Sequence, residues 1–274
     1  MAQDFSHISI EKADAGFRFT EGPVWSRDGF LLFSDVPNNV IRKLAPGERS
    51  TVFRDNSNGA TGNALDAQGR LYICESRTRR VVRIDKKGNL EVLAEKWEGK
   101  RLNAPNDIIV RRDGHVYFTD PAFGDQADRR ELNFYGVYHI PVKGPMSLVA
   151  RPEGRPNGIA LSPNGRILYV ANSDERNIRA YDLDRNGEAS NERILIAGID
   201  GPPDGIRVDE KGNLYVAATN LPVYSPDGKL LHTLEFGERP ANCAFGDPDL
   251  QTLYITARTS LYRVRLNVKG ALQH

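Results

Sequence analysis

Four oxygen-bearing side chains recur at one point of a repeated sequence pattern, and together they could bind a cation. Each precedes a short apolar run, a turn that contains Gly and a second apolar run. These lead-in residues are Glu21, Asn106, Asn157 and Asp204. No Cys or His stands at this point of the pattern. Hard oxygen donors favour Ca²⁺, with Mg²⁺, Mn²⁺ or Zn²⁺ as alternatives, and they argue against a structural zinc site.

The lead-in residues have a second interpretation, in which Asn, Asp and Gly occur only because they form turns. It does not account for Glu21, which is a poor turn residue, nor for the Pro that precedes the other three lead-in residues. Two carboxylates that converge on one point repel each other and raise one pKa, a cost that a divalent cation removes. We therefore interpret the four residues as a functional set.

The elements that must position this set are short strands. The pattern occurs six times, with weaker copies that begin near Thr61 and Asn242. A repeat of roughly 40–50 residues that holds four alternating strands is typical of one propeller blade. The sequence thus predicts an all-β fold, a six-bladed β-propeller of four-stranded antiparallel blades, as a single domain over residues 1–274. A closed ring would aim the lead-in residues at its axis.

Closure of the ring is expected to use both ends of the chain. The last repeat lacks an outermost strand, and residues 7–12 could supply it beside the C-terminal strands. Closure would also remove exposed sheet edges. Residues 96–101 and 125–132 are expected to be loops with at most one helical turn. A β-sandwich or an open solenoid is the structural alternative.

Composition and charge exclude several classes of protein. Lys and Arg number 37 and Asp and Glu number 36, a formal net charge of +1, so no nucleic-acid partner is expected. No apolar segment approaches the length that spans a bilayer, and no signal peptide is visible, so no membrane partner is expected. We expect a cytoplasmic protein, or a periplasmic one if a leader has been removed, that is a monomer or weak dimer. Cys74 and Cys243 are interpreted as buried free thiols, although a disulfide between them is an alternative.

Other catalytic signatures are missing from the sequence. The five His residues show no paired ligand spacing, and we interpret His115 and His139 as ordinary. There is no GxSxG elbow, no phosphate-cradling glycine loop and no CxxC motif. Nucleophilic-serine and nucleotide chemistry are therefore not expected.

Four motifs in order, at blade spacing, carry a family resemblance over nearly the whole chain. They read EGPVW, LNAPNDIIVRRDGHVYFTDPAFG, RPNGIALSPNGRILYVANS and PPDGIRVDEKGNLYVA. With them, the sequence resembles the gluconolactonase/SMP-30 (regucalcin) family of six-bladed propellers, and its last repeat looks most like the bacterial gluconolactonase branch. The resemblance implies a single divalent ion on the axis, bound by Glu21, Asn157 and Asp204. It places Asn106 beside the ion, in contact with the ion or with substrate.

The resemblance also implies residues that bind substrate. Asn103 and Asn106 compete for one such role, and we favour Asn106 because it shares the register of the other lead-in residues. Arg101 is a further candidate. A loop over residues 121–135 would cover the mouth of the site and offer Glu131 and Tyr135, although it could equally be a solvated crossover.

The activity that the resemblance implies is metal-dependent hydrolysis of sugar lactones by water. Asp204 is the candidate general base, acting either directly or beside a metal-bound hydroxide. A positioned base contributes about 10²- to 10⁴-fold. Two alternatives stay open: a phosphotriesterase-like hydrolase on the same metal site, and a non-enzymatic propeller that binds partners.

Overall fold

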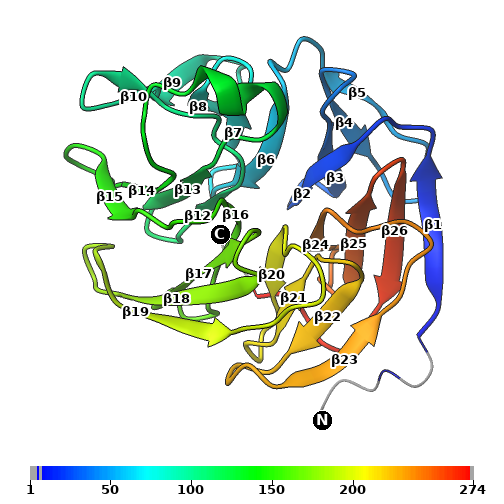
Figure 1. The fold of residues 1–274 in the computed structure, drawn as a ribbon. Helices are drawn as coiled ribbons and strands as arrows, with labels where there is room; N and C mark the ends of the chain where they lie inside the picture. The colour runs from blue at the N-terminus through cyan, green and yellow to red at the C-terminus, as the bar shows by residue number, and fades with distance from the viewer. Residues whose placement is uncertain (1–4, 6–7, 272–274) are drawn as a thin grey trace.

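Strands make up nearly all of the regular structure in the computed structural model, which describes residue 5 and residues 8–271. Six sheets of four antiparallel strands surround a common axis like the blades of a propeller (Figure 1). In five blades the strands follow in chain order from the axis outward, and in the sixth β1 is the outermost strand. The predicted six-bladed β-propeller is confirmed.

The strands are distributed over the blades as follows. Blade 1 contains β2 (Thr20–Ser26), β3 (Phe30–Asp35), β4 (Val40–Leu44) and β5 (Thr51–Arg54). Blade 2 contains β6 (Ala60–Leu65), β7 (Leu71–Glu75), β8 (Arg80–Ile84) and β9 (Leu90–Ala94). Blade 3 contains β12 (Ile108–Val110), β13 (Val116–Asp120), β14 (Gly136–Ile140) and β15 (Ser147–Ala150). Blade 4 contains β16 (Pro156–Leu161), β17 (Ile167–Asn172), β18 (Asn177–Leu183) and β19 (Ala189–Ile196). Blade 5 contains β20 (Ile206–Val208), β21 (Leu214–Val216), β22 (Leu221–Tyr224) and β23 (Leu230–Leu234). Blade 6 contains β24 (Asn242–Gly246), β25 (Thr252–Ala257), β26 (Ser260–Arg265) and β1 (Ile10–Ala15).

The ring is closed by β1, which pairs with β26 as the outermost strand of blade 6. Ile10 lies opposite Val264, and the guanidinium of Arg263 forms a 2.8 Å ion pair with Glu11. Closure by the N-terminal segment was predicted from residues 7–12. Its first member, His7, lies outside the described residues, and the strand runs on to Ala15.

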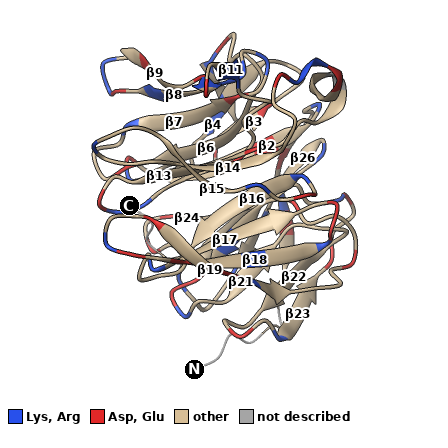
Figure 2. Ribbon diagram, turned by 60° about the vertical axis from the view of Figure 1, so that its left-hand side comes forward, with Lys and Arg blue, Asp and Glu red and all other residues tan. Residues whose placement is uncertain are grey.

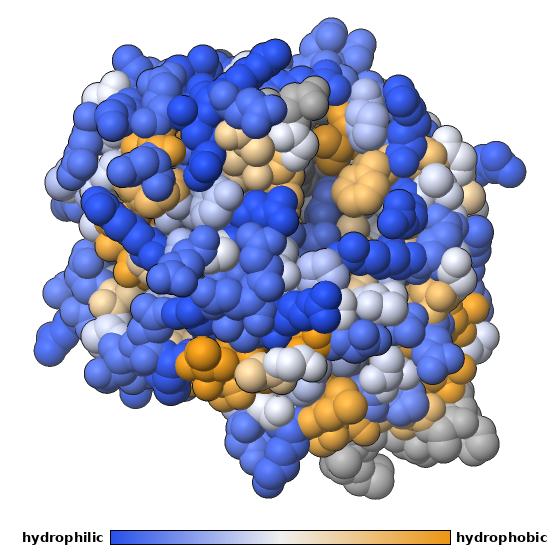
Figure 3. Space-filling model, viewed as in Figure 1, coloured by the Kyte–Doolittle hydropathy of each residue, from blue (hydrophilic) through white to orange (hydrophobic). Residues whose placement is uncertain are grey.

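Apolar side chains are buried between blades, because each sheet presents one face to each neighbour. The described residues form six apolar clusters, one at each of the six interfaces. Their largest fully buried members include Tyr72, Tyr117, Tyr138, Tyr215 and Phe118. Charged residues are concentrated on the loops and outer strands (Figure 2). Hydrophilic residues accordingly cover most of the face in Figure 3.

Two connections depart from the blade pattern. Residues 96–101 form a small hairpin of β10 (Lys96–Trp97) and β11 (Lys100–Arg101), where a loop or a helical turn was predicted. Positive φ angles at Glu98 (48°) and Gly99 (83°) allow its two-residue turn. The second connection contains a 3₁₀ helix, η1 (Gly124–Arg129), in the segment where one helical turn was predicted.

The pairing of two innermost strands is irregular near their first residues. The pairing register shifts between Glu21 and Val24 in β2, and between Pro156 and Ile159 in β16. An extra residue at such a bulge rotates the side chains that precede it. These shifts fall at the lead-in residues.

Candidate metal and active site at the ring axis

Backbone hydrogen bonds link the lead-in positions of neighbouring blades around the axis. Gly62 N donates to the carbonyl of Asn106 (2.7 Å), and Gly158 N donates to the carbonyl of Asp204 (3.2 Å). The lead-in residues therefore lie at one level of the ring.

Glu21 and Asp204 bring two carboxylates to this level. Burial, and then the charge of Asp107, raise the pKa of Glu21 from 4.5 to about 7. Burial, and then the charge of Glu21, raise the pKa of Asp204 well above its ordinary value. Because Coulomb effects of this kind act over short distances, Glu21 and Asp204 share one electrostatic environment. In this environment ionisation of both carboxylates is costly unless a cation is present.

Asn157 is oriented by partners on two blades. Its side chain hydrogen bonds to the carboxylate of Asp204, and its Nδ2 donates to Ser173 Oγ over 3.1 Å. Ser173 Oγ in turn donates to the carbonyl of Pro203 (2.7 Å), and Thr119 Oγ1 donates to the carbonyl of Asn157 (2.7 Å). With Nδ2 engaged, Oδ1 of Asn157 is the atom suited to bind a cation.

Asn106 is half-buried at the same level, in blade 3. Its backbone N donates to the carbonyl of Thr119 (2.9 Å), and its own carbonyl accepts from Thr61 Oγ1 (2.7 Å). The main chain of Asn106 is thus fixed on both sides, and its side chain is less buried than that of Asn157. This exposure suits a residue that contacts both an ion and a substrate.

At the position one residue after the lead-in residue, four of the six blades have Gly, because the inner strands of neighbouring blades lie very close together there. An added Cβ at Gly158 would lie 2.2 Å from the carbonyl oxygen of Asp204, and one at Gly205 would lie 2.1 Å from Cγ of Asn242. The four glycines of this layer are Gly22, Gly62, Gly158 and Gly205. The other two blades carry Asp107 and Asn242, whose side chains occupy the narrow space.

The sixth repeat is therefore shifted by one residue from the predicted alignment. Gly205 N donates to the carbonyl of Ala241 (2.8 Å), so Ala241 holds the lead-in position where Asn242 was expected. Asn242 lies one residue deeper, and its Nδ2 donates to Glu21 Oε2 over 3.2 Å. Ala241 has no polar side chain, so blade 6 offers no ligand at the lead-in position. It contributes instead the hydrogen bond from Asn242, which holds the carboxylate of Glu21.

Asp107 was not predicted as a site residue. The sequence did offer a signal, because Asp107 follows its lead-in residue at a position where four other repeats have Gly. It is 1% exposed, and its carboxylate accepts hydrogen bonds from Ile108 N (3.0 Å) and Ile159 N (3.2 Å). Arg207 Nη1 lies 3.8 Å from Asp107 Oδ2. Burial raises the pKa of Asp107, and Arg207 opposes this shift.

Asn103, one of the two competing substrate-binding candidates, is committed to the protein scaffold. It is 1% exposed, and its Nδ2 donates to the carbonyls of Asp120 (3.0 Å) and Phe134 (2.9 Å). Its backbone N donates to the carboxylate of Asp120 (2.8 Å). These contacts hold the 121–135 loop against blade 3 and leave the side chain little access to a ligand.

Arg101, Glu131 and Tyr135 lie on the 121–135 loop or against it. Arg101 N donates to Glu131 Oε2 (2.9 Å), and Arg79 Nη1 lies 3.6 Å from Glu131 Oε1. The Arg101 guanidinium donates to the carbonyl of Thr78 (2.8 Å). The ring of Tyr135 packs under the guanidinium of Arg130. Arg101 and Glu131 are both exposed and joined to each other, so the structure gives them a shared role in fixing the loop.

The donor set at the axis fits a divalent cation with hard-oxygen preference. It offers two carboxylates of raised pKa and two amide side chains, whereas no three His, Cys, Asp or Glu of the described residues converge on a common point. Such a mixture suits Ca²⁺ and leaves positions for further oxygen ligands. Glu21, Asn106, Asn157 and Asp204 are the residues that could hold it.

Cysteine and histidine side chains stand apart from this set. Cys74 and Cys243 are buried free thiols, as predicted. His115 Nδ1 and His139 Nε2 lie 2.7 Å apart, and burial, followed by the neighbouring His115, lowers the pKa of His139 to about 4. Within residues 8–271 the chain forms no helix long and apolar enough to cross a membrane.

Comparisons with known proteins place the chain among related propellers. Residues 19–259 match the sequence model of the SMP-30/gluconolactonase/LRE-like region. A gluconolactonase of Zymomonas mobilis is 35% identical, over 95% of this chain and 82% of that protein. A diisopropyl-fluorophosphatase of Loligo vulgaris is 27% identical, over 86% and 84%. The solved structure of a gluconolactonase from Xanthomonas campestris superimposes with a TM-score of 0.88 at 33% identity, over 95% of this chain and 90% of the other.

Proposed function

Because this chain belongs to the SMP-30/gluconolactonase/LRE-like family, we propose that it hydrolyses sugar lactones of the glucono-1,5-lactone type with one divalent ion. The observation that carries the proposal is the carboxylate pair of Glu21 and Asp204, whose pKa values are both raised at the axis. The substrate class comes from the gluconolactonase relatives. The product would be the open-chain sugar acid.

The ion would be held by Glu21, Asn106, Asn157 and Asp204. Hard oxygen donors suit Ca²⁺, Mg²⁺ and Mn²⁺ better than Zn²⁺, and among these we propose Ca²⁺, which tolerates an irregular set of carboxylate and amide oxygens. When bound, such an ion polarises the lactone carbonyl and stabilises negative charge on its oxygen. The hydrogen bonds of Ser173 to Asn157 and of Asn242 to Glu21 would keep the ligand oxygens in place before the ion arrives.

Asp204 is the proposed general base. Its carboxylate would accept a proton from the attacking water as the water oxygen bonds to the carbonyl carbon. When the ring C–O bond breaks, Asp204 would return that proton to the leaving ring oxygen, which becomes a hydroxyl group. A bound cation lowers the pKa of a carboxylate, and the burial of Asp204 acts in the opposite direction and preserves its basicity. Its backbone N donates to the carbonyl of Ala217 (2.7 Å), which fixes its approach.

Substrate contacts are proposed for Asn106 and for the 121–135 loop. Asn106 is less buried than Asn157 and lies at the level of the carboxylates. Tyr135 offers an aromatic surface to the sugar. Arg101 and Glu131 would act together, because their hydrogen bond joins the loop to the hairpin at residues 96–101.

A phosphotriesterase-like activity on the same residues is the second candidate. It is favoured by the likeness to the diisopropyl-fluorophosphatase of Loligo vulgaris. A phosphoryl oxygen could take the place of the lactone carbonyl oxygen, so the two activities would share one ion.

The deciding experiment measures acid release from glucono-1,5-lactone in weak buffer, with the spontaneous rate subtracted. The protein is first stripped with a chelator and then titrated with Ca²⁺, Mg²⁺, Mn²⁺ or Zn²⁺. Activity that disappears on stripping and returns with one ion supports the proposal and identifies the metal. Fluoride release from diisopropyl fluorophosphate is measured in parallel. Fluoride release without lactone hydrolysis would select the second candidate, and inactivity on both substrates without ion binding would favour a binding scaffold.

A further inference from the structure

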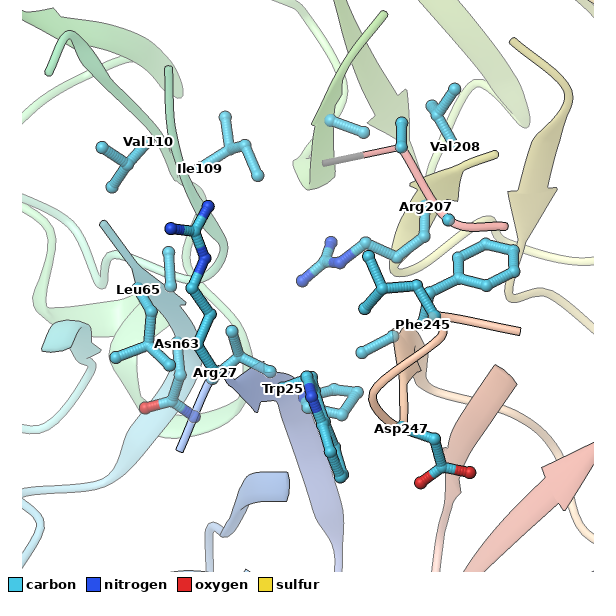
Figure 4. A pocket seen from close by; sticks show the side chains of 18 of the residues that line it. Trp25, Arg27, Asn63, Leu65, Ile109, Val110, Arg207, Val208, Phe245 and Asp247 are labelled. Atoms are coloured by element: carbon cyan, nitrogen blue, oxygen red, sulfur yellow. The ribbon is translucent and has the colours of Figure 1, made fainter. Parts of the chain in front are cut away.

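A positive charge lies inside the ring, deeper along the axis than the carboxylates that would bind the ion. Arg207 follows Asp204 in blade 5, and its side chain extends from β20 into the space that the inner strands enclose (Figure 4). That side chain is 11% exposed. Its Nη1 donates to the carbonyl of Ile206 (2.6 Å) and lies 3.8 Å from Asp107 Oδ2. The guanidinium is thus held inside the ring, beside an acidic residue of blade 3.

Asn242 connects this pair to a proposed metal ligand. Its Nδ2 donates to Glu21 Oε2 over 3.2 Å, and its side chain also hydrogen bonds to the carboxylate of Asp107. One amide group therefore joins the carboxylates of blades 1 and 3, and Arg207 stands beside the second of them. Burial, and then the charge of Asp107, raise the pKa of Glu21, and the charge of Arg207 opposes this rise. Arg207 and Glu21 are therefore close enough for their charges to interact.

Arg239 is a second arginine whose charge acts on these carboxylates. Burial, and then the charge of Glu21, raise the pKa of Asp204, and the charge of Arg239 opposes this rise. Its Nε and Nη2 donate to backbone carbonyls of Ala218 (3.2 Å) and Pro202 (2.9 Å), in the loops of blade 5. Arg207, in contrast, is paired with the buried carboxylate of Asp107 and lies on an inner strand.

A fixed positive charge at this place has opposite effects on the two states of the site. Without a divalent ion, Glu21, Asp107 and Asp204 bring three carboxylates together near the axis, and the guanidinium of Arg207 attracts them. With a divalent ion bound, the same guanidinium repels the ion, because both are positively charged. A group that stabilises the ion-free protein more than the ion-bound protein weakens ion binding by the same free energy.

We propose that Arg207 is an internal counter-ion of the axial site, which holds the carboxylates together when no ion is bound. Its guanidinium supplies part of the positive charge that the divalent ion would bring, so the ring keeps its structure in the ion-free protein. By the same charge it weakens the binding of the ion and makes that binding reversible. The inference rests on the proposed ion site, and it identifies a residue that sets how tightly the ion is held.

Two measurements on Arg207→Met separate this role from a purely structural one. Thermal melts with chelator should give a lower melting temperature than that of the parent protein, because Asp107 loses its counter-charge. Calorimetric titration with Ca²⁺ at pH 8.5, which favours ionised carboxylates, should show binding that is about fivefold tighter or more. A side chain that only supports the fold would lower the melting temperature and weaken calcium binding together. Equal or weaker calcium binding by Arg207→Met would therefore overturn the proposal.

Matched variants test whether the effect comes from charge. Arg207→Lys keeps the positive charge, and its affinity for Ca²⁺ should lie within about twofold of that of the parent, below the range of typical coupling effects. Asp107→Asn removes the negative charge of the same pair and should weaken calcium binding about fivefold or more. Arg49→Met, at an exposed position between β4 and β5, is the control for loss of an arginine and should leave both measurements unchanged. Calcium binding by Arg207→Lys as tight as that of Arg207→Met would refute the role of charge.

The parent protein separates failure of this inference from failure of the ion site. A parent that binds no Ca²⁺ would contradict the proposed calcium site and, with it, the role of Arg207. A parent that binds Ca²⁺ with the same affinity as Arg207→Met would refute the role of Arg207 and leave the ion site standing.

Discussion

Asn242 donates a hydrogen bond from Nδ2 to Glu21 Oε2 over 3.2 Å, and this bond joins the innermost strand of the last blade to that of the first. Glu21 Oε2 also accepts from the backbone N of Gly22 (2.7 Å). Two donors therefore hold one carboxylate oxygen, which leaves Oε1 to face a ligand. A residue that links the last blade to the first therefore also orients a proposed metal ligand.

Replacing Asn242 with Leu should weaken calcium binding. The substitution removes a donor from a buried carboxylate, and loss of a partner that orients a metal ligand typically costs about 10–100-fold in affinity. Calorimetric titration with Ca²⁺ at pH 7.5 measures the change. Asn164→Leu, in an exposed turn of blade 4, is the control for loss of an Asn side chain. Equal affinity in both variants would contradict a role for Asn242 at the site.

Asp204→Asn should retain the fold and lose about 10²- to 10⁴-fold in lactone turnover, the usual contribution of a positioned base. Asp209→Asn is the matched control in the same blade. Asp209 is buried and accepts hydrogen bonds from Asn213 Nδ2 (2.7 Å) and Tyr215 Oη (3.3 Å), away from the lead-in level. The Asp209→Asn variant should therefore have a lower melting temperature, whereas the molecules that remain folded should turn over lactone at the normal rate. Near-normal turnover of Asp204→Asn would eliminate it as the base.

The stabilisation that Ca²⁺ confers should increase with pH. In the ion-free protein the pKa of Glu21 is raised from 4.5 to about 7, and that of Asp204 is raised too. Between the ordinary and raised values the folded state binds more protons than the unfolded chain, so its stability falls as pH rises. An ion that requires both carboxylates ionised binds better as they lose protons.

Thermal melts with Ca²⁺ and with chelator, from pH 5 to pH 8, measure this increment. Asp120, whose pKa is raised to about 7 by burial, affects both samples alike and cancels in the difference. An increment in melting temperature that is the same at every pH would show that the carboxylates do not titrate with ion binding.

Gly158→Ala should be poorly tolerated although alanine differs by one methyl group. The added Cβ would lie 2.2 Å from the carbonyl oxygen of Asp204, so the inner strands would have to separate. Overpacking of this kind costs about 1–3 kcal/mol, and each kcal/mol lowers the melting temperature by roughly 2–4 °C in a domain of this size. Gly237→Ala is the control, because no atom lies within 4 Å of its added Cβ. Similar melting temperatures for the two variants would refute close packing at the axis.

The blade architecture was predictable because each strand has its own local pattern. Alternation of apolar residues and the Gly-containing turns recur in every repeat, and the lead-in residues mark where each repeat begins. Closure by the N-terminal segment followed from the missing strand of the last repeat. The hairpin at residues 96–101 was missed, because the turn at Glu98 and Gly99 joins strands of only two residues each.

The residues that lie behind the proposed metal ligands, Asp107 and Asn242, could not be derived from the repeats alone. Asp107 and Asn242 act across blades, and their partners are distant in sequence; Asn242 and Glu21 are 221 residues apart. The one-residue shift of the sixth repeat was hidden, since Asn242 resembles a lead-in residue in type. Only the hydrogen bond from Gly205 to Ala241 reveals its true level. The positions of Arg101 and Glu131 likewise depend on how a loop lies against blade 3.

The pairing of β1 with β26 has a consequence for synthesis on the ribosome. The first strand of the chain has no partner until residues 260–265 have been translated, so its edge stays exposed while the other five blades form. Unpaired edges invite association with other chains, and nascent proteins are held in that condition for many seconds. The hydrogen bond between Asn242 and Glu21 also forms only when the last blade arrives. Premature termination near the C-terminus would thus release a chain with nearly all its blades but an open ring, a species prone to aggregate.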